Sequence, residues 1–250
     1  MTAMIINEDC MTALASIADE SVDCILTDPP YGETALEWDR WPTGWPALVR
    51  RVLKKTGSMW VFGSMRMFFD HFDEFSGWRL SHDVVWEKHN GSGFLNDRFR
   101  RVHELALHFY RSDARWDDVY KQPQFTNDAR ARVVRKKARP AHWTGATGET
   151  IYRSEDGGPR LMRSVMFCRS EHSRALHPTQ KPLALVEPLL LYACPPGGTV
   201  LDIFAGSGTT GLAAKVNGRS SILIEGKPEF AEIARQRLEN DAPLFAGSAA

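Results

Sequence analysis

A strand, a glycine-rich loop and the start of a helix follow one another in Thr199-Val-Leu-Asp-Ile-Phe-Ala-Gly-Ser-Gly-Thr-Thr-Gly211. The loop satisfies the GxGxxG pattern, and Glu225 follows the next predicted strand. Glycines let the backbone approach a ligand, helix N–H groups attract negative charge, and the acid can accept hydrogen bonds from ribose hydroxyls. This order predicts a nucleotide site in an α/β fold. The loop alone fits a nicotinamide dinucleotide as well as S-adenosylmethionine.

Around this stretch the periodicity of apolar residues predicts strands that alternate with helices. The expected strands are 4–7, 23–27, 58–62, 83–86, 105–110, 199–203 and 221–224. The expected helices are 10–17, 45–53, 183–192, 210–216 and 228–239, the second of them ended by Lys54-Lys55-Thr56-Gly57. This alternation predicts a doubly wound, mostly parallel sheet.

The same periodicity divides the chain into four parts. Residues 1–111 and 177–240 hold the predicted strands and helices, and 112–176 has no clear periodicity and is rich in Arg, Asp, Gly and Thr. Residues 241–250 form a tail. We therefore expect one α/β domain whose two halves flank a variable insertion.

The charge of the chain is balanced in total but unevenly distributed. The 250 residues carry 31 basic and 31 acidic side chains, a net charge of +0, which argues against a small basic protein that coats nucleic acid. Residues 1–95 carry −6, 96–175 carry +7 and 176–250 carry −1. Six basic residues fall within ten positions: Arg130, Arg132, Arg135, Lys136, Lys137 and Arg139. Such a run fits a solvated loop, or a surface that contacts a phosphate backbone.

Cysteine use and hydropathy predict an intracellular protein. The four cysteines have no CxxC spacing and no histidine near them at metal-ligand spacing, so we expect neither disulfides nor a metal site. The N-terminus lacks the pattern of a signal peptide, and the most apolar stretch, 183–194, is too short to span a bilayer. We expect a soluble cytoplasmic protein.

A second motif, Asp28-Pro-Pro-Tyr31, follows the predicted strand 23–27. Asp, Pro and Gly in this order also make a rigid turn. The chemical interpretation is more specific, because Asp28 and the Pro29 carbonyl could accept both hydrogens of an exocyclic amino group and leave its lone pair free to attack an electrophile. Tyr31 offers a face on which a base flipped out of a duplex can stack.

Together with Phe204-Ala-Gly-Ser-Gly208 and the preceding His177-Pro-Thr-Gln-Lys-Pro182, this tetrapeptide resembles the amino-group DNA methyltransferases. The order of the parts is similar to that of their beta class. The resemblance implies a Rossmann-like methyltransferase fold with permuted halves, S-adenosyl-L-methionine as cofactor, and methyl transfer to adenine N6 or cytosine N4. Aspartate in the first position of the tetrapeptide favours adenine.

The resemblance also implies roles for individual residues. The catalytic residues are Asp28, Pro29, Pro30 and Tyr31. The cofactor-binding residues are Asp9, Cys10, Asp28, Pro29, His177, Thr179, Lys181, Phe204, Ala205, Gly206, Ser207, Gly208, Thr209, Thr210 and Glu225, with Glu225 on the ribose and Lys181 near the methionine end. Structural alternatives remain for three of them: Asp9 as a helix N-cap, Lys181 as the start of a helix and His177 as a loop histidine.

The resemblance further implies a prokaryotic or phage-encoded enzyme that acts on double-stranded DNA and pairs as a homodimer. Its variable region 112–176 should hold the elements that recognise the site, and the basic run between 130 and 139 should contact the DNA. Four other functions remain open: cytosine-N4 methylation, methylation of RNA or of a protein amide, a nicotinamide oxidoreductase, and a DNA-binding module without activity.

Overall fold

A computed structural model describes residues 2–92, 97–136, 150–171 and 176–240. The chain forms two compact units: unit 1 consists of 1–122 and 164–250, and unit 2 of 123–163. Unit 2 lies within the stretch 112–176 that we expect to be variable. Lys137, Arg139 and the predicted tail 241–250 lie outside the described residues.

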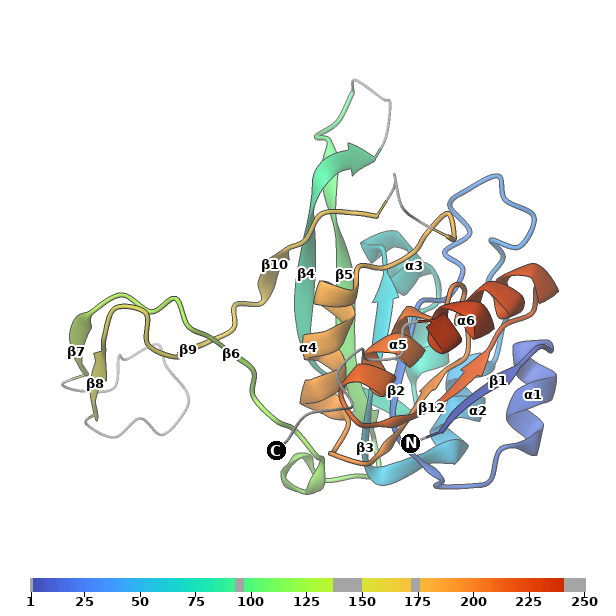
Figure 1. The fold of residues 1–250 in the computed structure, drawn as a ribbon, viewed down its shortest axis with the longest axis horizontal. Helices are drawn as coiled ribbons and strands as arrows, with labels where there is room; N and C mark the ends of the chain where they lie inside the picture. The colour runs from blue at the N-terminus through green and yellow to red at the C-terminus, as the bar shows by residue number, and fades with distance from the viewer. Residues whose placement is uncertain (1, 93–96, 137–149, 172–175, 241–250) are drawn as a thin grey trace. The chain divides into compact units, whose positions relative to one another are not determined.

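Unit 1 is built on an eight-stranded sheet (Figure 1). In spatial order its strands are β1 (Ala3–Ile6), β12 (Ser220–Ile224), β11 (Thr199–Asp202), β2 (Val22–Thr27), β3 (Leu53–Gly63), β5 (Arg101–Arg111), β4 (Trp78–Ser92) and β10 (Val165–Phe167). Strand β5 is antiparallel to β3 and β4, and the other neighbouring pairs are parallel. The predicted doubly wound, mostly parallel sheet is confirmed.

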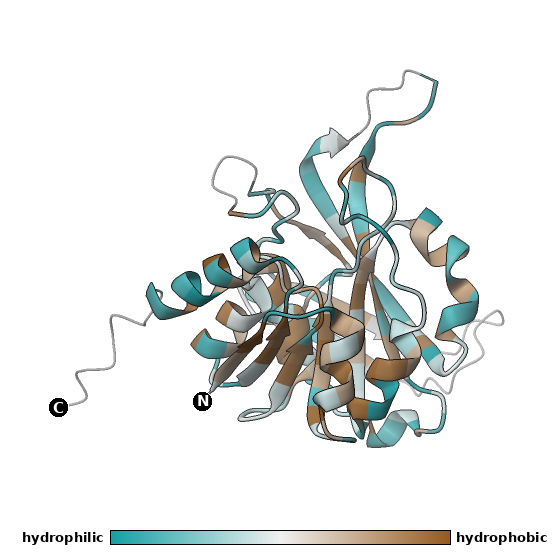
Figure 2. Cartoon of the chain, turned by 90° about the vertical axis from the view of Figure 1, so that its right-hand side faces the viewer, coloured by the Kyte–Doolittle hydropathy of each residue, from teal (hydrophilic) through white to brown (hydrophobic). Residues whose placement is uncertain are grey.

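Helices cover both faces of the sheet. On one face lie α1 (Cys10–Ser16), α2 (Trp45–Val52) and α3 (Met65–Asp70); on the other lie α4 (Leu183–Ala193), α5 (Thr209–Val216) and α6 (Pro228–Asn240). The side chains of β2 alternate, since Ile25 packs with the first set of helices and Cys24 and Leu26 with the second. Figure 2 shows the hydrophobic strands between helices whose outer surfaces are hydrophilic. The core therefore has two apolar layers, one on each side of the sheet.

The predicted range of the second helix is correct to within one residue, but the interpretation of the residues after it as a helix stop is wrong. Helix α2 ends at Val52 and passes directly into β3 at Leu53, so Lys54-Lys55-Thr56-Gly57 lies inside a strand. The Lys54 ammonium pairs with the Asp23 carboxylate at 2.7 Å, so that Lys54 is held against the neighbouring strand β2. These four residues therefore belong to a strand that pairs with β2 and do not form a turn after the helix. Short elements that the periodicity did not predict are α3, the 3-10 turns Phe72–Phe75 and Trp116–Asp118, and β10.

The described residues of unit 2, 123–136 and 150–163, include two small antiparallel strand pairs. Strand β6 (Phe125–Thr126) pairs with β9 (Arg160–Leu161), and β7 (Arg132–Lys136) pairs with β8 (Thr150–Ser154). Sequence periodicity indicated no firm element here. Within the described part of the whole chain, no helix has the length and apolar character that crossing a membrane requires.

Candidate active site

The parallel strands bring both sequence motifs to one edge of the sheet. Residues β2 Cys24 and Ile25 pair with β11 Val200 and Leu201, so the segments that follow these two strands emerge side by side. Strand order reverses between β2 and β11, and ligands of doubly wound folds bind at such a switch point.

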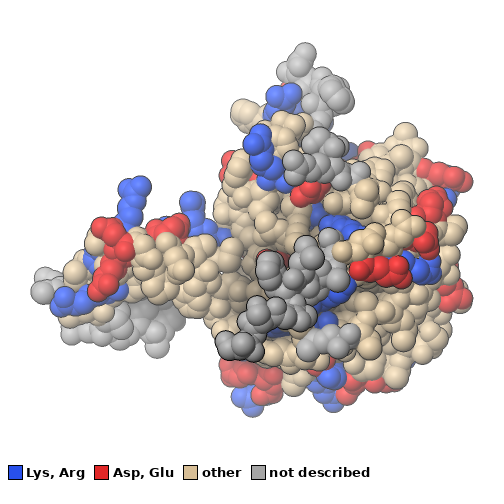
Figure 3. All heavy atoms as spheres, in the orientation of Figure 1, with Lys and Arg blue, Asp and Glu red and all other residues tan. Residues whose placement is uncertain are grey.

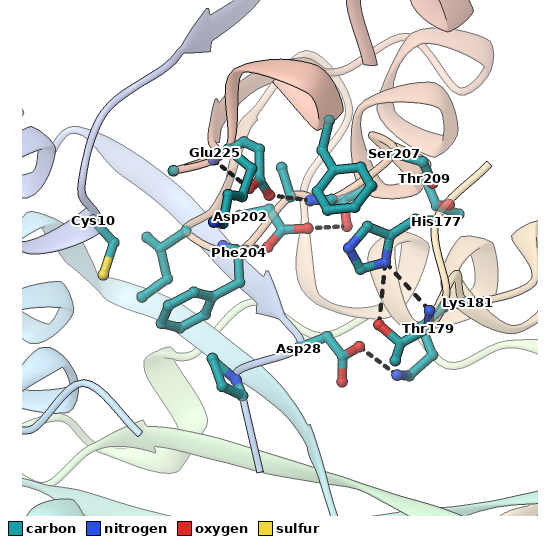
Figure 4. Close-up of a pocket in the computed structure, with 18 of the residues that line it drawn as sticks. Cys10, Asp28, His177, Thr179, Lys181, Asp202, Phe204, Ser207, Thr209 and Glu225 are labelled. Atoms are coloured by element: carbon teal, nitrogen blue, oxygen red, sulfur yellow. Dashed lines mark hydrogen bonds and ion pairs between the residues drawn. The ribbon is translucent and has the colours of Figure 1, made fainter. Parts of the chain in front are cut away.

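A cavity of 440 Å³ opens at this switch point (Figure 4). Its lining combines the acidic ends of the strands, the glycine-rich loop, the segment before α4 and part of the loop between β2 and α2. The lining residues are Asp9, Cys10, Leu26, Asp28, Pro30, Trp38, Arg40, Pro42, Phe62, His177, Thr179, Gln180, Lys181, Val186, Asp202, Ile203, Phe204, Ala205, Gly206, Ser207, Thr209, Thr210, Glu225, Gly226, Lys227 and Phe230.

The glycine-rich loop requires glycine where it turns into α5. Gly206 has φ +51° and Gly208, the N-cap of α5, has φ +78°. A Cβ on Gly208 would lie 3.0 Å from Ala234 Cβ, so the loop also packs closely on α6. The N–H of Ala205 donates to Ile224 O at 2.9 Å, which attaches the loop to β12.

Glu225 holds the loop from the end of β12. Its Oε2 accepts from the N–H of Gly206 and its Oε1 from the N–H of Lys227, both at 2.8 Å. Burial raises the pKa of Glu225 above its ordinary value, and these two hydrogen bonds oppose the rise. A carboxylate offers about four lone-pair sites, so Glu225 retains acceptor capacity toward the cavity.

Asp202, at the end of β11, is a buried acid. Its Oδ1 accepts from Thr27 Oγ1 at 3.0 Å and from the N–H of Phe204 at 3.2 Å, and its Oδ2 accepts from Thr210 Oγ1 at 2.6 Å. Burial raises its pKa to about 6 against the effect of these hydrogen bonds. The carboxylate therefore ties β2, β11 and α5 together beneath the cavity.

The tetrapeptide after β2 is tied to the segment before α4. Asp28 Oδ2 forms an ion pair with Lys181 Nζ, and Asp28 Oδ1 accepts from the Tyr31 hydroxyl at 2.7 Å. Burial raises the pKa of Asp28, and the Lys181 ammonium opposes that rise. The same ammonium lies 5.2 Å from the centroid of the Phe62 ring.

A second carboxylate, Glu104 at the start of β5, completes this cluster. Glu104 Oε2 lies 3.5 Å from Lys181 Nζ and 3.4 Å from the Tyr31 hydroxyl oxygen. Glu104 Oε1 forms an ion pair with Lys88 on β4. Burial alone would raise the pKa of Glu104, but the two ammonium groups lower it to about 2. The acid and its partners form a network of opposite charges at the side of the cavity.

His177 closes another part of the cavity wall. Its ring lies edge-on to Phe230 at 4.2 Å between centroids and 5.4 Å from Trp38. Burial, helped by the Lys181 charge, lowers the pKa of His177 to about 4, so the ring is neutral near pH 7. Three residues further along the chain, the side-chain oxygen Oε1 of Gln180 accepts a hydrogen bond from Ser207 Oγ at 2.9 Å. This bond connects the segment to the glycine-rich loop.

The structure brings most of the predicted site residues together in the cavity lining. Three predicted residues are not in the lining: Pro29, Tyr31 and Gly208. Of these, Tyr31 contacts Asp28 and Gly208 packs on α6. Asp9 lines the cavity and is also the N-cap of α1, where its Oδ1 accepts from the N–H of Met11 at 3.0 Å. Lys181, placed by the resemblance near the methionine end, has its ammonium on Asp28.

Sequence reasoning did not single out several residues of the site. Asp202 had a signal, since it ends the strand that leads into the glycine-rich loop. Gln180 stands inside the motif His177-Pro-Thr-Gln-Lys-Pro182 but was given no role, and Trp38 was noted only as a tryptophan in a loop. Glu104, Arg40 and Phe230 had no signal that separates them from ordinary strand, loop or helix residues.

The predicted DNA-contacting residues belong to unit 2 or to the undescribed part of the chain. Arg130 and Arg132 are exposed, and the Arg132 guanidinium lies 5.9 Å from the Tyr152 ring centroid. Arg135 and Lys136 are on β7. Among the described residues, no group of three or more His, Cys, Asp or Glu side chains is arranged to hold a metal ion.

A doubly wound sheet with a glycine-rich loop and the Asp28 tetrapeptide at one switch point defines a Rossmann-like protein with a nucleotide-type site. The chain belongs to the DNA methylase family of N6/N4 enzymes, whose family model matches residues 22–236. The resemblance seen in the sequence is thereby confirmed, and the protein is a DNA-methylating enzyme. S-adenosylmethionine is the methyl donor of this family, as predicted.

Individual relatives agree with this family. The chain is 29% identical over 272 residues to the Type II methyltransferase M.HinfI of Haemophilus influenzae, a match that covers 96% of this chain and 69% of that protein. The crystal structure of M1.HpyAVI with S-adenosylmethionine is similar with a TM-score of 0.63 and 26% identity, over 95% of this chain and all of that one. The PvuII cytosine-N4-specific methyltransferase shares the fold with a TM-score of 0.66 at 19% identity, over 97% and 88% of the two chains.

Proposed function

We propose that this chain is a site-specific methyltransferase that transfers a methyl group from S-adenosylmethionine to N6 of an adenine flipped out of duplex DNA. The observation that carries the proposal is that Asp28 and the glycine-rich loop line one cavity. An acceptor for an amino group and a nucleotide-binding loop are thereby close enough to serve one reaction.

The cavity has the size and the donors that the cofactor needs. Its volume of 440 Å³ lies in the range of small-molecule sites, about 300–1,000 Å³. We assign the nucleoside end to the wall formed by Asp9, Cys10 and Glu225, where Glu225 has lone pairs for ribose hydroxyls. Gly206 leaves room for close approach, and we assign the methionine end to the part of the lining that contains Thr179 and Ser207. Bound there, the cofactor supplies a methyl group on a positively charged sulfur.

The residues of the tetrapeptide then act on the target amine. Asp28 and the Pro29 carbonyl accept its two hydrogens, which turns the nitrogen lone pair out of conjugation and toward the methyl group. The new N–C bond forms as the C–S bond breaks, and Asp28 offsets the positive charge that develops on nitrogen. The surplus proton then leaves the nitrogen for water. Tyr31 holds the flipped base on its ring face.

The choice of adenine over cytosine rests on the tetrapeptide itself. Both bases present an amino group beside a ring nitrogen, and aspartate before Pro-Pro-Tyr favours adenine. The cytosine-N4 enzyme with the same fold is too distant in sequence to bear on this choice. N4-methylation of cytosine is the second candidate.

The proposal extends to the setting of the reaction. We propose that unit 2 contacts the phosphate backbone of duplex DNA through Arg130, Arg132, Arg135, Lys136, Lys137 and Arg139, that the enzyme works as a homodimer, and that it acts in the cytoplasm of a prokaryotic cell. The oligomeric state is tested by sedimentation with and without duplex DNA.

Asp28→Ala tests the catalytic assignment. We expect the variant still to bind S-adenosylmethionine by calorimetry and to lose methyl transfer by at least about 1,000-fold, because the acceptor in contact with the developing charge is gone. Tritium transfer to duplex DNA measures the loss, and Asp83→Ala, on the exposed side of β4, is the control. Normal turnover of Asp28→Ala would refute the role of the tetrapeptide.

Expression of the chain in cells without DNA methylation tests the target base. Digestion of the genomic DNA and mass spectrometry should give N6-methyladenine, and sequencing of the modified positions gives the recognition site. N4-methylcytosine would instead establish the second candidate. Transfer to RNA or protein but not to DNA would contradict the substrate, and DNA binding without any transfer would leave a binding module.

A further inference from the structure

Asp28, Tyr31, Lys88, Glu104 and Lys181 form a cluster beside the cavity, which we call the catalytic cluster. Within it, the carboxylates of Asp28 and Glu104 share two hydrogen-bond donors. The Lys181 ammonium is paired with Asp28 and lies 3.5 Å from Glu104. The Tyr31 hydroxyl donates to Asp28 at 2.7 Å and lies 3.4 Å from Glu104. Short shifts of both donors would therefore move their hydrogen bonds from Asp28 to Glu104 (the Asp28–Lys181 contact is drawn in Figure 4).

Such a shift matters because Lys181 opposes the proposed chemistry. A positive charge develops on the target amine as the methyl group is transferred, and Asp28 has to stabilise it. An ammonium paired with the same carboxylate neutralises part of its charge and repels the developing cation. Lys181 has little access to water, since its side chain is only 8% exposed and the Phe62, Tyr31 and Trp86 rings surround its Nζ at 5.2, 5.7 and 5.9 Å. Its alternative partner must come from the protein.

Glu104 has the properties of that partner. The side chain is 11% exposed and is fixed by the Lys88 ion pair, which keeps it charged and oriented. The carboxylate retains lone pairs after it has bound Lys88. Other titratable groups that feel the cluster electrostatically are Asp202, through Asp28, and His177, through Lys181.

We propose that Glu104 is the positioning residue of the catalytic pocket: it takes over the Lys181 ammonium and the Tyr31 hydroxyl when the target amine binds, so that Asp28 faces the amine with its full charge. The proposal rests on the proposed function, because it assigns the amine to Asp28. Glu104 is not among the residues that line the cavity and acts through Lys181 and Tyr31.

Glu104→Gln tests the proposal, because glutamine keeps the size of the side chain and removes its charge. We expect kcat to fall about 10- to 100-fold, less than the loss of a group in direct contact with the reacting atoms, with KM for DNA and Kd for the cofactor unchanged within about twofold. The acidic limb of the kcat profile should move to lower pH, because the Glu104 charge raises the pKa of Asp28. Asp202 and His177 are the same in both proteins, so the displacement between the two profiles reports Glu104.

A double variant separates positioning from net charge. Glu104→Gln with Lys88→Met removes one charge of each sign, which keeps the net charge of the cluster and leaves no unpaired Lys88. We expect kcat to remain low in the double variant, since Lys181 still has only Asp28 as partner, and Glu104→Asp to recover part of the loss. Glu87→Gln, an exposed residue of β4, is the control for the same chemical change.

Three outcomes would overturn the proposal: wild-type kcat in Glu104→Gln, full recovery in the double variant, or a loss confined to KM and stability with no displacement of the pH profile. Each of them leaves the proposed function intact as long as the wild-type chain methylates DNA and Asp28→Ala does not. Absence of methyl transfer by the wild-type chain would instead contradict the proposed function itself.

Discussion

A single residue, Asp202, makes the free energy of unfolding depend on pH. Its carboxyl is buried and has a pKa raised to about 6, whereas an unfolded chain has the ordinary value near 3.8. The folded state therefore binds the proton more tightly than the unfolded state. The resulting stabilisation is fully present below the ordinary pKa and is lost as pH rises through about 6.

We expect Asp202→Asn to remove this dependence. The free energy of unfolding of the wild type relative to Asp202→Asn should fall by up to about 3 kcal/mol between about pH 4 and about pH 7. The Thr27 and Thr210 hydroxyls can act as donors or acceptors, so the amide can keep its hydrogen bonds. Urea unfolding at a series of pH values measures the difference, and Asp83→Asn is the exposed control. The prediction would be contradicted if the free energies of unfolding of the wild type and Asp202→Asn differed by the same amount at every pH.

Single residues also show how much of the site can be predicted from the sequence. Asp28 and the glycines of the loop stand in contiguous motifs whose chemistry is local, so the order of residues alone is enough to recognise them. Glu104 lies in the ordinary alternation of β5 and gains its importance only because Lys181, from a distant segment, folds against it. A contact between segments far apart along the chain leaves no mark in the spacing of either.

At the scale of elements, the glycine-rich loop depends on how closely it packs on α6. Gly208 and Gly197 both have φ near +75° (+78° and +74°), so an alanine at either position carries the same backbone strain. Only at Gly208 does the new Cβ meet a neighbour, Ala234 Cβ at 3.0 Å, whereas nothing lies within 4 Å at Gly197. Comparing the alanine variants at Gly208 and Gly197 therefore isolates the contribution of packing against α6 to the free energy of unfolding.

We expect Gly197→Ala to lower the free energy of unfolding by about 1 kcal/mol. Gly208→Ala should lower it by about 2–4 kcal/mol, because overpacking against a helix backbone adds to the strain. Displacing the start of α5 should also weaken S-adenosylmethionine binding in Gly208→Ala alone. Urea unfolding and calorimetry measure the two effects. Equal losses in the two variants would show that the loop does not need its close approach to α6.

Elements with a strong local pattern could be predicted, and those set by neighbours could not. The strands around both motifs and the helices α1, α4, α5 and α6 have apolar periodicity and turn residues at their ends, and they form within a few residues of the expected ranges. The direction of β5 depends on its pairing with β3 and β4, which periodicity does not encode. The change from α2 to β3 at Leu53 goes with the pairing of β3 to Val22 of β2, a contact that the local stop signal does not reveal.

At the scale of the whole molecule, the two units have opposite net charges. Unit 2 contains nine basic and four acidic residues, a net charge of +5, so unit 1 carries −5 in the neutral chain. Figure 3 shows acidic and basic side chains on one face of the molecule. An acidic catalytic unit disfavours indiscriminate binding to DNA, and a basic unit supplies contacts to phosphates.

This division predicts that DNA binding depends strongly on salt and that the dependence belongs to unit 2. Replacing Arg132, Arg135, Lys136 and Lys137 with glutamine should weaken binding, and the slope of log K against log salt should shrink in magnitude by about 3.6, since each of the four lost phosphate contacts lowers the number of released counterions by about 0.9. Fluorescence anisotropy with a labelled duplex at several salt concentrations measures the slope. The control is Lys55→Gln with Arg79→Gln, two exposed basic residues of unit 1 at the strand ends away from the cavity, which should leave the slope unchanged. An unchanged slope in the quadruple variant, or an equal change per charge in the control, would show that the basic run is a solvated loop and that the contacts to DNA lie elsewhere.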